Sequence, residues 1–274
     1  MRNSVIRNNL LIIITMLFTF SCAQTKESEH NISTETVAFP EYIFTPTTNL
    51  NDQIADTLAA AKSHNKQALF VLGTQWCHDS KGLAQQFSTP QMQKILTDHY
   101  QVLFVDAGFF DKGFDLVQQF SLPVYYGTPT VMVVDPNSNK IQNRLSMKKW
   151  LNAYKVPLNE YVEYFTNFAT NNEKPREISS AMQTYLTAIN DFEIEQAVRL
   201  KAAYGVISPL LKQYMESDNK DSSAEFTDKW QQVSGFRSRI QDDIQVLITQ
   251  AKSNIEAGSS APLILPTYPS FTWE

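Results

Sequence analysis

The chain has 274 residues, 43% of them hydrophobic, and carries 28 acidic against 23 basic side chains for a formal charge of −5. This length is sufficient to bury a core, and it indicates one domain with an appendage or two small domains. The excess of acidic residues and the absence of a dense Lys/Arg run are not typical of a nucleic-acid-binding protein, which needs a basic surface. We therefore expect no nucleic-acid partner.

The first residues have the order of a signal peptide. Arg2 and Arg7 form a positive region, and an apolar run follows from Leu10 to Phe20. A run of this length reaches only about half of a ~30 Å hydrocarbon core at ~1.5 Å per residue, which is too short for a comfortable membrane span. We therefore expect residues 1–21 to be a cleaved leader and the protein to be exported.

The end of the apolar run, Thr19-Phe20-Ser21-Cys22, resembles the lipobox of bacterial lipoproteins. The resemblance implies that Cys22 is lipidated, becomes the mature N-terminus, and anchors the protein to a membrane of the cell envelope, at its periplasmic or surface face. The alternative is ordinary secretion, with Cys22 lost with the leader or left just beyond the cut. The sequence has one other cysteine, Cys77, so lipidation of Cys22 would leave Cys77 without a partner and the chain without a structural disulfide.

Residues 22–48 are polar and contain prolines, which predicts a flexible tether. Residues 49–170 then alternate short helical periods with apolar runs typical of buried strands. This alternation predicts βαβ units, and a hairpin near the end adds an antiparallel edge, so we expect an α/β sandwich around a mixed sheet. The expected strands are 68–73, 102–106, 130–134 and about 141–145. The first expected helix starts near 49, the second starts at Cys77 and ends near 88, the third includes residues 92–96, the fourth spans 114–120, and a last one ends near 168.

Residues 171–258 predict an all-helical appendage of three helices. Gly205 breaks the first helical pattern, and Ser208-Pro209 suits the N-cap and first position of a second helix. Ser222 and Glu225 fit a capping box for a third helix, whose apolar series Arg237 interrupts. Such an appendage packs on itself or on the sandwich, or docks a protein partner. The tail, residues 259–274, is too rich in proline to be helical.

Two short motifs identify a candidate site. Trp76-Cys77-His78-Asp79-Ser80 follows a buried strand, and Gly127-Thr128-Pro129 precedes a later one. Together they resemble the thioredoxin superfamily over residues 50–168. The resemblance implies a thioredoxin-like sandwich in which Pro129 is cis and the Thr128-Pro129 loop faces the cysteine and pairs with the backbone of a client. The alternative for Pro129 is a trans proline at the entry to a strand.

The position of Cys77 has a chemical reason of its own. Free N–H groups and the dipole at a helix N-terminus favour the nucleophilic thiolate, and a protonated His78 acts in the same direction, whereas Asp79 opposes it. Ser80 stands where the resemblance implies a resolving cysteine; it can donate a hydrogen bond to the thiolate but cannot form the second disulfide. Val71 stands about where the family has a buried acid. Both departures favour monothiol chemistry.

Two hypotheses follow. The first is a monothiol thiol–disulfide oxidoreductase or isomerase in which Cys77 acts on client proteins or small thiols with Trp76, His78 and Ser80 around it. The second is a non-catalytic binding module or scaffold, in which the cis-proline groove or the helical appendage docks a partner and the thiol is vestigial. The alternative for Cys77 itself is a small buried hydrophobe. The histidines are scattered along the chain, so the sequence indicates no metal site, and it indicates no cofactor.

Overall fold

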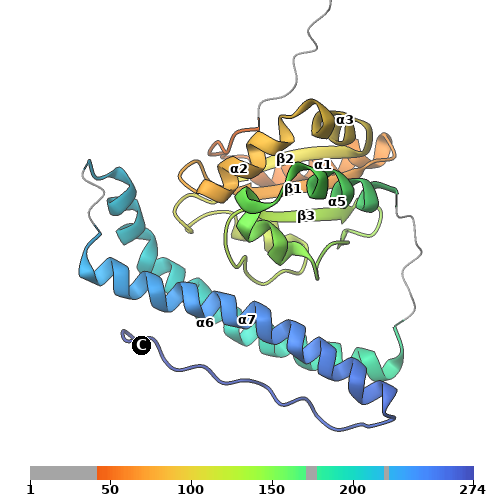
Figure 1. Ribbon diagram of the computed structural model, residues 1–274, viewed down its shortest axis with the longest axis vertical. Coiled ribbons are helices and arrows are strands. Elements are labelled where there is room, and N and C mark those ends of the chain that lie inside the picture. The colour runs from red at the N-terminus through yellow and green to blue at the C-terminus, as the bar shows by residue number, and fades with distance from the viewer. Residues whose placement is uncertain (1–41, 171–177, 219–221) are drawn as a thin grey trace, which may run out of the picture. The chain divides into compact units, whose positions relative to one another are not determined.

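The computed structural model describes residues 42–170, 178–218 and 222–274. The predicted leader, Cys22 and most of the predicted tether lie outside these residues. The order of the described elements follows the sequence expectation up to residue 134, after which the details differ (Figure 1). The elements are α1 Leu50–Ser63, β1 Gln67–Gly73, α2 His78–Phe87, α3 Pro90–His99, β2 Tyr100–Asp106, α4 Phe114–Gln119, β3 Thr130–Asp135, β4 Lys140–Ile141, the 3-10 segment η1 Met147–Lys155, α5 Leu158–Thr170, α6 Ser180–Glu216 and α7 Ala224–Glu256.

The described strands form a mixed sheet in the order β2-β1-β3-β4. β1 runs parallel to β2 and antiparallel to β3, so that Phe70 of β1 lies opposite Leu103 and Met132. Side chains alternate between the two faces of a strand, and both faces of β1 are buried. Leu69 and Val71 join a core with α2, α3, η1 and α5, whereas Phe70 and Leu72 join a core with α1, α4, α6 and α7. The mixed α/β fold that the sequence predicts is confirmed.

The fourth strand is much shorter than the sequence predicts. It pairs with β3 only over Lys140–Ile141, and the backbone of Gln142 adds one bond to the Val133 carbonyl. The buried side chain of Asn143 then replaces the backbone ladder: its Oδ1 accepts from the Val133 N–H at 2.9 Å, and its Nδ2 donates to the Val131 carbonyl at 2.9 Å. The prediction of a strand to Leu145 was therefore wrong, because a side-chain amide satisfies the edge of β3 instead.

The described residues between 178 and 256 form two long helices, α6 and α7, which lie side by side (Figure 1). The predicted break at Ser208-Pro209 was wrong, since α6 continues through both residues. A proline inside a helix costs about 3 kcal/mol, but Tyr204, Ile207 and Leu211 on either side of it are buried, and this packing offsets the cost. The start of α7 also differs by one residue: Ser223, not Ser222, caps it by accepting from the Phe226 N–H at 3.0 Å.

The α6–α7 hairpin shares a core with the sandwich and is not a separate module. Leu200, Tyr204, Phe236 and Ile240 are buried in the same cluster as Phe70 of β1. The segment that follows α7 is not helical, as its prolines predict, and its Phe271 is buried in this cluster too. None of the helices in the three described ranges is both long and apolar enough to cross a membrane.

Candidate thiol site

The site begins where β1 ends. After Gly73 the chain turns through Thr74, Gln75 and Trp76, and Cys77 is the N-cap of α2, with an extended backbone conformation (φ −76°, ψ 125°). The buried Thr74 sets this turn: its Oγ1 accepts from the Cys77 N–H at 3.2 Å. Thr74 was not singled out from the sequence, although a polar residue directly after a fully buried strand was the available signal.

The two motifs meet in space. The Thr128–Pro129 peptide bond is cis, which confirms that prediction. The Cys77 thiol donates a hydrogen bond to the Thr128 carbonyl oxygen, with an S···O distance of 3.3 Å. Cys77 as a whole is half-buried, and it does not belong to either of the two buried clusters that flank β1. The structure therefore brings the cysteine and the cis-proline loop together.

Ser80 lies in the first turn of α2 but does not contact Cys77 through a hydrogen bond. Its side chain is fully buried, and its Oγ accepts from the Thr74 N–H at 3.3 Å. No hydrogen bond joins it to Cys77 among the residues that the structure describes. The predicted donation from Ser80 to the sulfur is absent here because the hydroxyl is turned toward the end of β1.

Trp76 is held on one side of the cysteine by the loop that follows β2. Its indole N–H donates to the Gly108 carbonyl at 2.8 Å. Its ring is stacked with Phe109 at 6.3 Å between centroids and meets Phe110 edge-on at 5.5 Å. Phe109 and Phe110 were missed from the sequence, because only the folded β2–α4 loop brings them to Trp76.

His78 and Asp79 both contact η1. The exposed His78 ring lies 3.7 Å from the Tyr154 ring, centroid to centroid, and Asp79 Oδ1 accepts from the Tyr154 N–H at 3.1 Å. The Asp79 carboxylate is thus bound by a backbone donor, so part of its charge is compensated. The expected opposing effects of His78 and Asp79 on the thiol remain predictions.

Two buried tyrosines, Tyr125 and Tyr126, lie four and three residues before the cis-proline. Burial raises the pKa of Tyr125 well above 10, and burial together with the neighbouring Glu193 carboxylate raises that of Tyr126. Both phenols therefore stay neutral donors near neutral pH.

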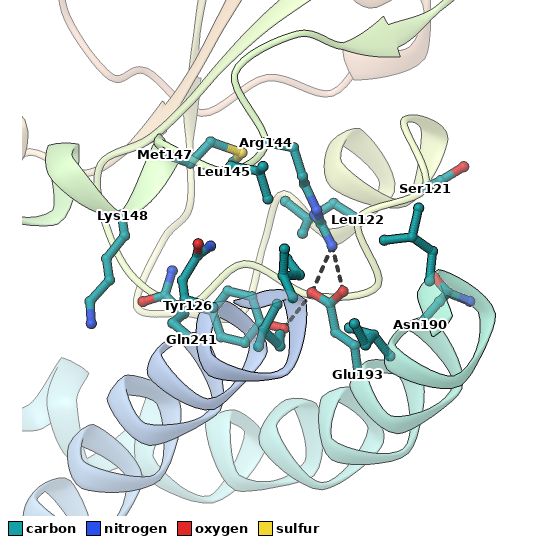
Figure 2. Close-up of a pocket in the computed structure, with 15 residues that line it drawn as sticks. Ser121, Leu122, Tyr126, Arg144, Leu145, Met147, Lys148, Asn190, Glu193 and Gln241 are labelled. Carbon is teal, nitrogen blue, oxygen red and sulfur yellow. Dashed lines mark hydrogen bonds and ion pairs between the residues drawn. The ribbon is translucent and has the colours of Figure 1, made fainter. Parts of the chain in front are cut away.

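A hollow lies beside Tyr126, and Cys77 is not among the residues that line it (Figure 2). It has a volume of about 260 Å³, and Arg144, Met147, Glu193 and Gln241 are among the residues that line it. No group of three His, Cys, Asp or Glu side chains within the described part of the chain could hold a metal ion.

The sheet, the cysteine that caps α2 and the facing cis-proline define a thioredoxin-like fold. The family comparison agrees with this class, since residues 48–136 match a family described as thioredoxin-like. Among solved structures, the chain is similar to a disulphide isomerase from Xylella fastidiosa Temecula1, with 25% identity and a TM-score of 0.42, over 48% of this chain and 97% of that one. No curated protein matches significantly.

Proposed function

We propose that the protein carries out monothiol thiol–disulfide exchange through Cys77. One observation supports this most: the Cys77 sulfur lies at the start of a helix, half-buried, 3.3 Å from the carbonyl of the cis-proline loop. A helix N-terminus favours the thiolate, which is the nucleophile in exchange. Partial exposure gives an incoming disulfide access to it.

The reaction balances without an added oxidant or reductant. The Cys77 thiolate attacks one sulfur of a client disulfide, an S–S bond forms between Cys77 and the client, and the other client sulfur leaves as a thiolate. A second thiolate, from the same client or from a small molecule, then attacks the client sulfur of the mixed disulfide. A new S–S bond forms between these two sulfurs, and Cys77 leaves as a thiolate. Because Ser80 cannot make this second attack, resolution comes from outside the chain.

In this proposal the Thr128 carbonyl accepts a hydrogen bond first from Cys77 and then from the client. Its bond to Cys77 requires the S–H proton, so the bond is lost when Cys77 ionises or joins a client. The freed carbonyl can then accept from a backbone N–H of the client, which aligns the client disulfide with the sulfur.

The proposal extends to location. The leader-like residues 1–21 and Cys22 support export and lipid anchoring in the bacterial cell envelope. Globomycin-sensitive processing and radiolabelled palmitate incorporation that disappears in Cys22→Ala would support the anchor. Secretion of a soluble mature chain without label would contradict it.

A direct experiment uses a peptide that contains one disulfide with a fluorescent leaving half. The wild-type chain should release the leaving half and retain the other half on Cys77 as a dithiothreitol-sensitive adduct, found by mass spectrometry. Cys77→Ser should release none. A wild-type chain that forms no adduct would favour the alternative, a thioredoxin-like binding module without thiol chemistry.

A further inference from the structure

The α6–α7 hairpin forms hydrogen bonds to Tyr125 and Tyr126, two consecutive residues shortly before the cis-proline Pro129. The Tyr204 hydroxyl of α6 donates to the Tyr125 carbonyl at 3.0 Å. The hydroxyl of the next residue, Tyr126, donates to Glu193 Oε1 of α6 at 2.6 Å (Figure 2). These bonds join positions 67 and 79 residues apart in the sequence, so they exist only when the hairpin is docked.

The Glu193 end of this attachment is fixed. Glu193 is only 5% exposed, and Arg144 Nη2 lies 2.7 and 2.6 Å from its two carboxylate oxygens (Figure 2). A buried carboxylate needs a paired cation and hydrogen bonds to be tolerated, and Arg144 and Tyr126 supply both. The Tyr126 hydroxyl is thereby one of the groups that balance Glu193, and its position is set by that pair.

The second helix of the hairpin, α7, lies near Gly127, the residue after Tyr126. The Arg237 guanidinium of α7 lies 5.2 Å from the Phe110 ring centroid and 5.3 Å from that of Trp230. A Cβ atom at Gly127 would lie 3.7 Å from Arg237 Nη1, at van der Waals distance, so the guanidinium lies beside the loop at Gly127. Phe110 in turn contacts Trp76, the residue before the cysteine.

We propose that the α6–α7 hairpin is a positioning element of the thiol site: Glu193 and Tyr204 hold Tyr126 and Tyr125 through hydrogen bonds, and Arg237 packs beside Gly127, so that the Thr128 carbonyl faces Cys77. The hairpin residues themselves act only through the loop and through Phe110. The hairpin thus sets how well the loop can pair with a client backbone, an effect that rests on the proposed exchange function.

The test removes the two loop-holding hydroxyls and keeps the rings, in the full-length double variant Tyr126→Phe/Tyr204→Phe. The matched control is Tyr185→Phe, because the Tyr185 hydroxyl also belongs to α6 and donates to backbone carbonyls, but those of Ser259 and Ala261 in the tail. Two measurements are made on each chain: hydrogen exchange of the Gly127 and Thr128 amides, and exchange rates with the peptide disulfide and with a small disulfide, dithiobis(nitrobenzoate).

We expect faster amide exchange at Gly127 and Thr128 in the double variant, by about fivefold for each hydroxyl lost, and no change in Tyr185→Phe. The peptide disulfide should show a KM raised by a similar factor, while the rate constant with the small disulfide, which needs no backbone pairing, stays within about twofold. A cooperative melting curve for the variant verifies that it is folded.

The two proposals fail in different ways. Unchanged amide exchange at Gly127 and Thr128 in a folded double variant overturns the positioning role, whatever the exchange activity. Faster amide exchange in a protein whose Cys77 reacts with neither disulfide supports the positioning role and contradicts the proposed function. Equal changes in Tyr185→Phe would mean that α6 is loosened generally, which also overturns the specific role.

Discussion

The Cys77 sulfur and the Thr128 carbonyl oxygen lie 3.3 Å apart, although 51 positions separate the two residues in the sequence. Cys77 follows the end of β1, and Thr128 lies in the loop directly before β3. The two strands are neighbours in the sheet. The pairing of β1 with β3 therefore builds the site.

Replacing Ser80 by cysteine should convert the site to a dithiol. Ser80 lies three positions after Cys77 in the first turn of α2, a separation over which a disulfide can close. We expect Ser80→Cys to form an internal disulfide and to gain insulin-reducing activity with dithiothreitol as reductant. Ser88→Cys, at the exposed C-cap of α2, is the control and should gain neither. A Ser80→Cys chain that forms the disulfide but reduces no insulin would mean that the groove does not admit a client.

Two glycines should respond to alanine in opposite directions. Gly113 has φ +79°, and a Cβ there would lie 2.3 Å from the buried Leu72 Cδ1, so Gly113→Ala should destabilise by about 3 kcal/mol. Gly235 lies inside α7 with nothing within 4 Å of its Cβ position, so Gly235→Ala should stabilise by about 0.5–1 kcal/mol. Urea unfolding midpoints measure both. A destabilised Gly235→Ala would show that the outer surface of α7 is covered.

Much of this architecture could be predicted from the sequence because its signals are local. The apolar run of β1, the motif at Cys77 and the motif at Pro129 each lie within a few residues, and the structure has the elements they predict. The features that were missed depend on tertiary contacts. Nothing local indicates that Asn143 will replace a strand ladder, or that burial of Ile207 and Leu211 will carry a helix through Pro209. Likewise Phe110 and Arg237 contact each other only because the fold brings α7 to the β2–α4 loop.

The contact between Arg199 and Glu274 should weaken in acid. The hydrogen bond from Arg199 lowers the pKa of the Glu274 carboxyl below its ordinary value of 4.5. A lowered pKa in the folded state means that the stabilisation is fully present above 4.5 and is lost as the pH falls through the folded-state pKa. The difference in melting temperature between wild type and Glu274→Gln should therefore shrink between about pH 6 and about pH 3. Glu256→Gln, at the exposed end of α7, is the control. A difference that stays constant over this range would contradict the assignment.

The most direct test of the central claim is the alkylation rate of Cys77 by iodoacetamide at neutral pH, in the folded chain and in the same chain unfolded in urea. The Cys77-containing peptide is followed by mass spectrometry, so that Cys22 does not interfere. The sulfur of a half-buried cysteine at a helix N-terminus should react faster in the folded chain than in the unfolded one if the helix favours the thiolate. A folded chain in which Cys77 reacts more slowly than in urea would contradict the account, since its sulfur would then be a protected thiol and not a nucleophile.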